Sequence, residues 1–324
     1  RRGLTSAIRV SAEHLPSGVE CPDVWIGPRV DRTVLVISAD RTATTYFGEL
    51  RVTGSSETVN RRIARGGVVV RTGQPNGWGR LTSQIPLSIA GDAAVRITAN
   101  GHETRNHHLY GELKIRHSPG GILDVAIHVE RRDAGHQAPV KLTGVGLPEL
   151  IANQTALIPA GSDKGYISFY LPPSLPVGRY SLAVRGETTV LKQDKKTETV
   201  TMFSNVVSFE VHPAAFQIDV DPYAPRRISR GKVVTVNYTA RRINGFINKI
   251  HTELAMPGRV TRVVGLRGRG VTFVGQTDTG TIQIIANEDA PLGQQPFLRL
   301  YAVGVIEDEP VFHGSCFLNL EVVD

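Results

Sequence analysis

The sequence predicts an all-β protein built from repeated sandwich domains. A long stretch occurs twice, because residues 15–54 align with residues 147–186 after a shift of 132 positions and without a gap. Apolar and polar residues alternate over many short runs, which Gly- and Pro-containing turns separate. No segment combines the apolar spacing and the caps of a helix. Because an internal repeat fixes the architecture, the chain is expected to be an array of one domain type.

The repeat is defined by turns and by the strands that follow them. Leu15-Pro16 matches Leu147-Pro148, Ile26 matches Ile158, and Val52-Thr53-Gly54 matches Val184-Arg185-Gly186. A weaker third copy has Met256-Pro257-Gly258 in place of the Leu-Pro turn, and its Ala290-Pro291-Leu292-Gly293 repeats Leu175-Pro176-Val177-Gly178. These matches predict three domains, at residues 1–92, 93–212 and 213–324.

Two similar openings mark the domain boundaries. Both the second domain, at Ala93-Ala94-Val95, and the third, at Ala214-Ala215-Phe216, begin with two alanines and an apolar residue. The linkers before them are short, and the second one contains Pro213. Short linkers of this kind restrict neighbouring domains, so we expect an end-to-end arrangement.

Each predicted strand rests on alternation or on a short apolar run between turns. In the first domain the expected strands are 6–12, 24–26, 33–39, 46–53, 67–70 and 85–89, of which 33–39 is expected to be buried. In the second domain they are 93–99, 109–115, 122–130, 140–145 and 204–211, besides those of the repeated stretch, and 188–199 is expected to be an exposed hairpin tip. In the third domain they are 233–238, 249–256, 271–273, 281–285, 297–303 and 316–322.

The first domain is expected to be incomplete at its N-terminus. Residues 93–146 precede the Leu-Pro turn of the second domain, whereas only residues 1–14 precede that of the first. A sandwich without its opening strands exposes sheet edges and core to water, which is unfavourable. Either upstream residues supply these strands or a partner chain donates them.

The charge of the chain leaves several partners open. The net charge is +7, from 37 Lys and Arg against 30 Asp and Glu. The basic residues are spread along strands, which favours a solvated surface, although a Gly- and Arg-rich run could contact a partner protein or an acidic polymer. Because this run has no aromatic residues to stack bases, nucleic acid is not an expected partner. The candidate contact residues are Arg259, Arg262, Arg267 and Arg269.

No catalytic residue, cofactor or membrane span is expected. A Gly-x-Ser-x-Gly elbow, a phosphate loop with its helix and an apolar run of membrane length are all missing from the sequence. Asp219 and Asp221 share a strand face and are the candidate ligands of a calcium ion at a domain junction, although two carboxylates are few for calcium. The histidines between His102 and His136 have irregular spacing and are expected at the surface. Cys21 and Cys316 are expected to be small buried apolar residues, with a disulfide as the alternative.

The order of the turns resembles that of a known kind of domain. The second domain reads GVGLP, then LIPAG, then LPVGRY, and ends on the strand NVVSFEV. This series is similar to the immunoglobulin-like β-sandwich repeats of large bacterial surface and secreted proteins. The resemblance implies a non-enzymatic, extracytoplasmic scaffold, spacer or adhesion module that docks to a protein partner or a surface assembly. The alternative is a region that binds and positions polysaccharide within a larger secreted hydrolase.

Overall fold

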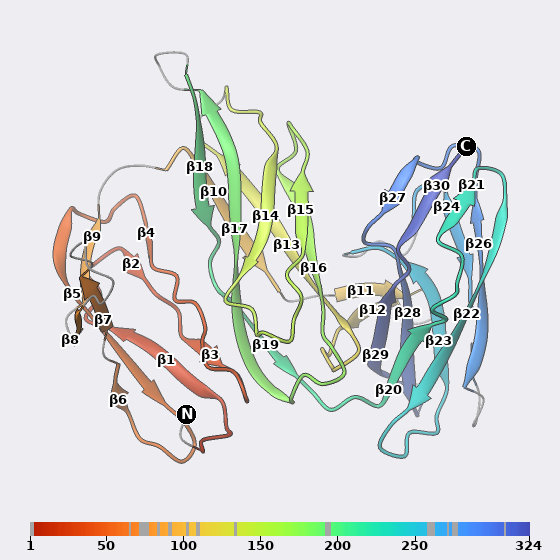
Figure 1. The fold of residues 1–324 in the computed structure, drawn as a ribbon, viewed down its shortest axis with the longest axis horizontal. Helices are drawn as coiled ribbons and strands as arrows, with labels where there is room; N and C mark the ends of the chain where they lie inside the picture. Colours follow the sequence, from red (N-terminus) through yellow and green to blue (C-terminus); the bar gives the residue numbers. More distant parts are fainter. Residues whose placement is uncertain are drawn as a thin grey trace.

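All regular structure in the described part of the chain is β-strand. The structure, a computed structural model, describes residues 3–64, 66–70, 78–82, 85–89, 93–101, 104–107, 111–132, 135–191, 196–257, 263–270, 272–273, 278–307 and 309–324. The strands β1 to β30 form several sheets (Figure 1), which confirms the all-β prediction. Within these ranges no helix has the length and apolar character needed to span a membrane.

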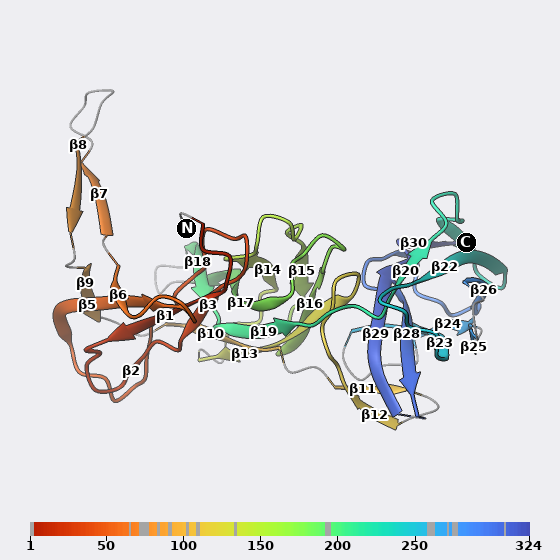
Figure 2. The ribbon, with the colours of Figure 1, turned by 90° about the horizontal axis from the view of Figure 1, so that it is seen from below.

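The first group of strands forms one main sheet. It contains β3 (Val24–Ile26), β1 (Ile8–Glu13), β5 (Tyr46–Ser55) and β6 (Arg62–Ile63) in that order, and β9 (Ile85–Ile89) pairs with the first half of β5. The short strands β2 (Val19–Glu20) and β4 (Ser38–Ala39) pair with each other. The strands β7 (Gly66–Val70) and β8 (Trp78–Thr82) form a ribbon that stands away from the body (Figure 2).

The middle group has two sheets around one core. One sheet is β10 (Val95–Asn100), β13 (Ile122–Arg131) and β16 (Lys164–Tyr170), and the other is β15 (Thr155–Ile158), β14 (Val140–Val145), β17 (Gly178–Leu191) and β18 (Thr197–Phe203). The first half of β17 pairs with β19 (Val207–Val211). Alternate residues of both sheets point inward and bury one cluster, which includes Ile97, Val125, Leu142, Ile167, Phe169 and Val184. A separate ribbon consists of β11 (Thr104–His107) and β12 (Gly111–Lys114).

The last group has a second core, between two four-stranded sheets. The first sheet is β20 (Phe216–Val220), β22 (Val233–Arg242), β26 (Thr279–Ala286) and β24 (Leu266–Arg269), and the second is β25 (Thr272–Phe273), β23 (Ile250–Ala255), β28 (Arg299–Ile306) and β29 (Glu309–Phe317). A three-stranded sheet of β21 (Arg227–Ser229), β30 (Leu320–Val323) and β27 (Gly293–Gln295) adds to it. The core includes Phe216, Tyr238, Ile282, Ile284, Leu298 and Leu300.

The strand pairing reproduces the 132-residue repeat. Val10 pairs with Gly54 on β5, and the residues 132 positions later, Leu142 and Gly186, pair in the same way. The match extends to neighbouring strands, because Ile8 pairs with Ile26 as Val140 pairs with Ile158. The Leu-Pro turns also agree, since the amide of Val19 donates to the carbonyl of Pro16 as that of Ile151 donates to Pro148. The repeat is therefore a repeat of hydrogen-bond registers and not only of residue types.

The predicted buried strand at 33–39 is wrong. Residues 31–37 belong to no strand, only Ser38–Ala39 is paired, and the side chains from Thr33 to Ile37 are half-buried. The corresponding strand of the middle group, β16, pairs with β13. Among the described strands, the first group has no counterpart of β13, so an apolar run alone does not make a strand here.

Several boundaries also differ from the prediction. The run expected as one strand at 316–322 is divided, because β29 ends at Phe317 and β30 begins at Leu320 in another sheet. The positive φ of Asn319 makes the turn between them. Of the strand expected at 109–115, Gly111–Lys114 pairs with β11, residue 115 lies beyond the strand and residues 109–110 lie outside the described residues. The strand expected at 204–211 begins at Val207.

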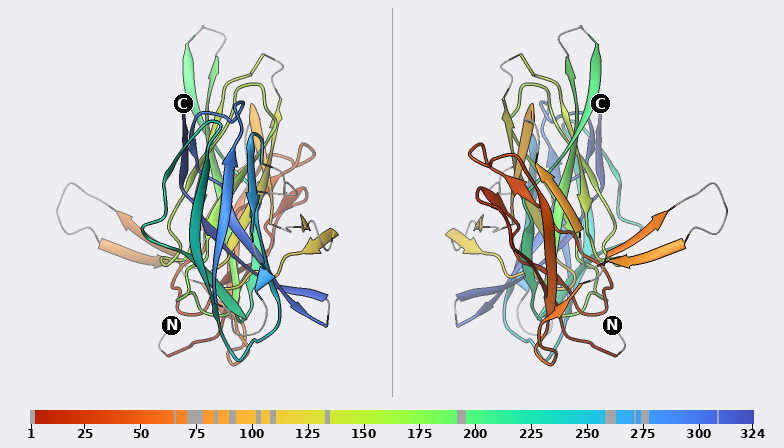
Figure 3. Two further views of the ribbon diagram at one scale, coloured as in Figure 1. Left: turned by 90° about the vertical axis from the view of Figure 1, so that its right-hand side faces the viewer. Right: turned by 90° about the vertical axis from the view of Figure 1, so that its left-hand side faces the viewer.

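The groups follow one another along the longest axis of the molecule. Strands β1–β9 lie at one end and β20–β30 at the other, with the two sheets of the middle group between them and the ribbon of β11 and β12 beside the last group (Figure 1). Seen along this axis, the body is narrow and the ribbon of β7 and β8 projects from its side (Figure 3). The boundaries 1–92, 93–212 and 213–324 stay predictions.

Candidate interaction surfaces

The predicted arginine contact falls on one edge of the sheet that contains β24. Arg267 lies on β24 with its side chain exposed, opposite Ile285 of β26, and the backbone of Arg269 lies opposite Gln283. Arg259 and Arg262 lie outside the described residues. Part of the arginine run thus lies on the edge strand of a sheet whose outer face is exposed to solvent.

That outer face is exposed and mostly uncharged. Pairing across β22 and β26 places Val233 beside Ile285, Thr235 beside Gln283, and Asn237 beside Thr281. On both strands these outward residues are exposed, and the residues between them are buried except for Val234, which is half-buried. A surface of hydroxyl and amide groups with a basic edge has the chemistry to contact a polar or acidic partner.

The two candidate calcium ligands are placed differently from each other. Asp219 is exposed on β20, whereas Asp221 follows the strand and its Oδ1 accepts a hydrogen bond from the amide of Tyr223 at 2.8 Å. This bond closes a turn, which is a common task of aspartate. In the described part of the chain, no three His, Cys, Asp or Glu residues are grouped as metal ligands would be. Calcium binding at these residues stays a prediction.

A buried ion pair joins the middle group to the last group. Nη1 of Arg299 on β28 donates to both carboxylate oxygens of Asp124 on β13, at 2.9 Å each. The hydroxyl of Ser168 on β16 donates to Asp124 and accepts from Nη2 of Arg299 at 3.2 Å. Both charged side chains are only 1% exposed. A buried charge is costly unless it is paired and hydrogen-bonded, and both conditions are met here.

Apolar and aromatic contacts surround this pair. Leu113 and Ile115 cluster with Ala255, Tyr301 and Val303, which lie on β23 and β28. The buried rings of His117 and His313 meet edge to face, with 6.2 Å between their centroids. The backbone joins as well, because the amide of Ser315 donates to the carbonyl of Gly120 at 3.2 Å.

This joint was not predicted from the sequence. Asp124 occupies an outward position of an alternating strand, where a polar residue is ordinary, whereas Arg299 lies on a strand whose other outward residues, such as Tyr301 and Val303, are aromatic or apolar. Asp124 and Arg299 are buried because the outer faces of two sheets meet. The expectation of surface histidines is wrong for His117 and His136, which are buried, whereas His128 is exposed.

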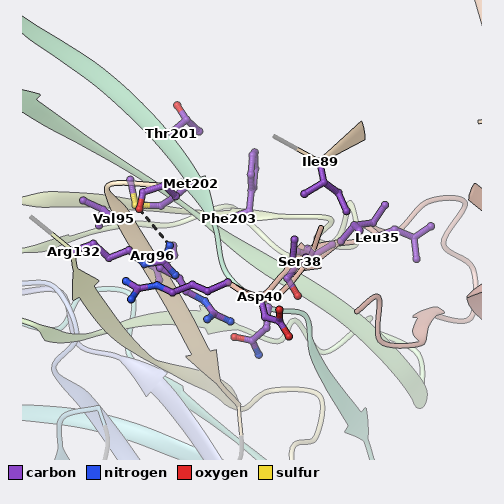
Figure 4. A pocket seen from close by; sticks show the side chains of 18 of the residues that line it. Leu35, Ser38, Asp40, Ile89, Val95, Arg96, Arg132, Thr201, Met202 and Phe203 are labelled. Atoms are coloured by element: carbon purple, nitrogen blue, oxygen red, sulfur yellow. Dashed lines mark hydrogen bonds between the residues drawn. The ribbon is translucent and has the colours of Figure 1, made fainter. Parts of the chain in front are cut away.

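A groove separates the first group from the middle group. We call it the strand groove, and its volume is about 610 Å³. One wall is the unpaired segment 34–37 with residues 38–41, and the other is formed by β10 and β18. Figure 4 shows Leu35 and Ile89 on one side and Arg96 and Arg132 on the other. Its lining includes Val34, Leu35, Ile37, Val95, Ile97 and Phe203.

A second, polar groove lies where β3 meets β17. Its volume is about 680 Å³, and Trp25, Arg9, Arg179 and Glu210 line it. The guanidinium of Arg179 lies over the indole of Trp25, at 5.2 Å from the ring centroid. One face of the only tryptophan side chain in the described part of the chain is therefore covered by a cation.

The two cysteines are free thiols. Burial, and then the charge of Asp219, raises the pKa of Cys316 to about 12. Burial also raises the pKa of Cys21, with a contribution from Asp23. Since the thiolate is the nucleophile, neither thiol is activated for chemistry.

Comparisons with known proteins give little further information. No protein-family model and no curated protein sequence matches the chain. Among solved structures, a marsupial T cell receptor matches over 72% of this chain and 99% of its own, at 9% sequence identity and a TM-score of 0.22. No conclusion about this protein rests on a likeness that low.

Proposed function

We propose that the chain is a non-enzymatic scaffold of tandem immunoglobulin-like sandwich domains. It acts outside the cytoplasm as a spacer or adhesion module in a larger protein or assembly. The paired sheets around one core and the shared registers of β1 and β14 support the sandwich arrangement. The hydroxyl of Tyr180 donates to the carbonyl of Pro176 at 2.6 Å, which matches the tyrosine corner of immunoglobulin folds.

We further propose that the first domain is incomplete. Its described strands include equivalents of β14, β15 and β17 but none of β10 or β13. In the described residues its buried side chains, such as Val24 and Leu50, form no core cluster of their own. A sandwich with one covered face of this kind needs a further strand to complete it.

The buried pair of Asp124 and Arg299 is the observation that best supports the proposed spacer role. A module that sets a distance between its neighbours needs joints that resist bending. Interfaces between domains are ordinarily polar and allow motion. This joint instead buries an ion pair in which one guanidinium nitrogen contacts both carboxylate oxygens, together with the Leu113 and Ile115 contacts and the His117–His313 contact, which favours one fixed angle.

X-ray scattering from the full chain in solution tests this role. We expect a single elongated particle whose longest dimension does not change between low and high salt, because a buried pair is screened little. The Arg299→Ala variant should broaden the distribution of interatomic distances. A wild-type chain that scatters as flexibly linked bodies would refute the spacer role. Fractionation of the source cells tests the extracytoplasmic location.

The alternative is a region that positions polysaccharide for a secreted hydrolase. The polar groove around Trp25 is the observation that favours it, since an indole bordered by Arg9, Arg179 and Glu210 can contact a sugar and its hydroxyl groups. Affinity electrophoresis in gels with neutral and acidic polysaccharides tests it. Retardation that Trp25→Ala abolishes and Arg267→Glu leaves unchanged would support the Trp25 groove. The reverse pattern would place an acidic polymer on the β24 edge, and no retardation would exclude both.

A further inference from the structure

The strand groove lies over residues that are fully buried in the other copy of the repeat. Leu35 and Ile37 correspond to Ile167 and Phe169, each of which is 0% exposed. In the middle group these two residues belong to β16, which pairs with β13 from Ile122 to His128. Leu35 and Ile37 remain half-buried and line the groove. The groove therefore occupies the place where the other copy has a strand.

The wall opposite Leu35 and Ile37 is the edge of a sheet. Among the described strands, β10 is the outermost of its sheet and pairs with β13 alone. Asn205 accepts from the amide of Ala99 at 2.8 Å and donates to its carbonyl at 2.9 Å, so the backbone of Ala99 points away from β13. Backbone groups two residues apart point to the same edge. Val95 and Ile97 thus direct theirs to this edge, and both line the groove.

Asn205 also shows how far the edge is already occupied. Its side-chain amide takes the place of a strand residue opposite Ala99, at one end of β10. The Asn205 side chain reaches only Ala99, and the next backbone groups along this edge, those of Ile97 and Val95, face the groove. Within the described residues neither segment has a strand partner on this side, and apolar side chains lie between them. An extended peptide adds as a strand to a site of this kind.

The charges along the groove indicate which end of a bound segment would carry acidic residues. Arg96 and Arg132 lie together on one side of the groove (Figure 4), and Asp40 and Arg41 line it as well. The carboxylate of Asp40 is held in a turn, where it accepts from the amide and the hydroxyl of Thr42. If the occupant pairs with residues 32–38 as β13 pairs with β16, its first residue lies opposite Ser38, close to Asp40 in the chain. Acidic residues at its N-terminal end would then meet Arg96 and Arg132, the second of which also contacts Glu130.

We propose that the strand groove binds an extended segment of a partner protein, which adds as a β-strand antiparallel to residues 32–38. The segment has apolar residues at every second position and acidic residues at its N-terminal end. This inference rests on the interaction role proposed above and names the chemistry of the partner. The proposal explains why Val34, Leu35, Val36 and Ile37 form an apolar run without a strand partner in the described chain.

A peptide with the sequence of β13 provides the probe. Dye-labelled ILDVAIHVER preceded by two glutamates is titrated with the full chain, and fluorescence anisotropy reports binding. We expect saturable binding, together with slower hydrogen exchange of the amides of residues 34–38. The same peptide N-methylated at the positions of Val125 and Ile127 should bind about tenfold more weakly, because it has lost two strand donors.

Variants of the chain locate the site. Leu35→Asp with Ile37→Asp places two charges in the apolar wall and should weaken binding by about tenfold or more. Leu157→Asp is the matched control, since Leu157 is exposed on β15 and does not line the groove. Arg96→Glu should weaken binding of the glutamate peptide by about threefold and strengthen that of a peptide preceded by two lysines. Lys141→Glu, at an exposed position outside the groove, should change neither.

Three results would overturn the proposal: no binding at millimolar peptide, equal binding to the Leu35→Asp/Ile37→Asp variant, or binding without slower exchange at residues 34–38. Scattering separates such a failure from that of the spacer role. If the particle is rigid and elongated but does not bind the peptide, only the proposed strand site is refuted. If the chain is flexible but binds the peptide at residues 34–38, only the proposed spacer role is refuted.

Discussion

Gly27 lies directly against the ring of Tyr180, so closely that a methyl group on Gly27 would overlap the ring carbons. Tyr180 is 1% exposed and stacks on Phe209 with 5.8 Å between the ring centroids. Beside this contact, the amide of Trp25 donates to the hydroxyl of Ser181 at 2.9 Å. The first group can thus pack this closely against the middle group only because residue 27 has no side chain.

Gly27→Ala should loosen this contact without unfolding either group. The added methyl group must displace Tyr180 or the first group, and overpacking of this kind costs about 1–3 kcal/mol. We expect faster hydrogen exchange at Trp25 and Ser181. Gly54→Ala is the matched control, because its methyl group would meet only ordinary contacts, the nearest at 3.6 Å from Ile8. Equal exchange in both variants would contradict the packing argument.

Removing one member of the buried ion pair should be far worse than removing both. Asp124→Leu or Arg299→Met alone leaves a buried charge without its partner, at a cost of about 3–5 kcal/mol. The double variant should recover most of that loss, because an apolar pair of similar volume is often as stable as the ion pair it replaces. Urea unfolding followed by hydrogen exchange in β13 and β28 measures the difference. Additive losses in the double variant would show that the two side chains are not coupled.

Acid should affect the first group through three carboxyl groups. The pKa of Glu13 is lowered, mainly by its hydrogen bond from Arg61, and that of Asp40 is lowered by Thr42. Burial raises the pKa of Asp23, but hydrogen bonds from Ser11 and Arg9 outweigh it and lower the pKa overall. A lowered folded-state pKa means that the stabilisation is complete above the unfolded-state value, near about 4. It is lost as the pH falls through the lowered values.

Hydrogen exchange between pH 6 and pH 3, corrected for intrinsic rates, measures this dependence. We expect protection in β1 and β5 to fall below about pH 4. In Arg61→Gln the fall at β1 should be smaller, because Glu13 then has no charged partner whose loss matters. Protection that rises as the pH falls would show that the sign is wrong.

Cys316 should resist thiol reagents in the folded protein. With a pKa raised to about 12, only a very small fraction is thiolate at pH 8. Iodoacetamide followed by peptide mass spectrometry should show slower labelling of Cys316 than of Cys21, and rapid labelling of both in denaturant. Labelling of Cys316 at the rate of an ordinary exposed thiol would contradict the burial argument.

The parts of the fold that local chemistry determines could be predicted from the sequence. The run from Val140 to Val145 alternates, and it forms the strand expected from its pattern. The gap-free repeat predicted equivalent turns, and the structure shows that the equivalence extends to the strand pairing, because matched turns impose matched registers.

The parts that depend on distant neighbours could not be predicted. Thr33 to Ile37 has the composition of a buried strand, but a strand also requires a partner, and composition does not supply one. Asp124 and Arg299 look like solvated residues, because alternation says which face a side chain is on and nothing about what covers that face. The sequence therefore indicated the sheets. It indicated neither the joint between the middle and last groups nor the groove between the first and middle groups.

The joint at Asp124 and Arg299 has a consequence for how such a chain can be divided or recombined. Each half of the ion pair is harmful without the other, so a fragment that stops near Pro213 would carry a carboxylate and an apolar patch, Leu113 and Ile115, bare to solvent. Gene fusions and exchanges that respect only the linker would inherit that defect. Asp124 and Arg299 accordingly have to stay together when the chain is divided or recombined, and the two sandwiches proposed in residues 93–324 would be inherited as one unit.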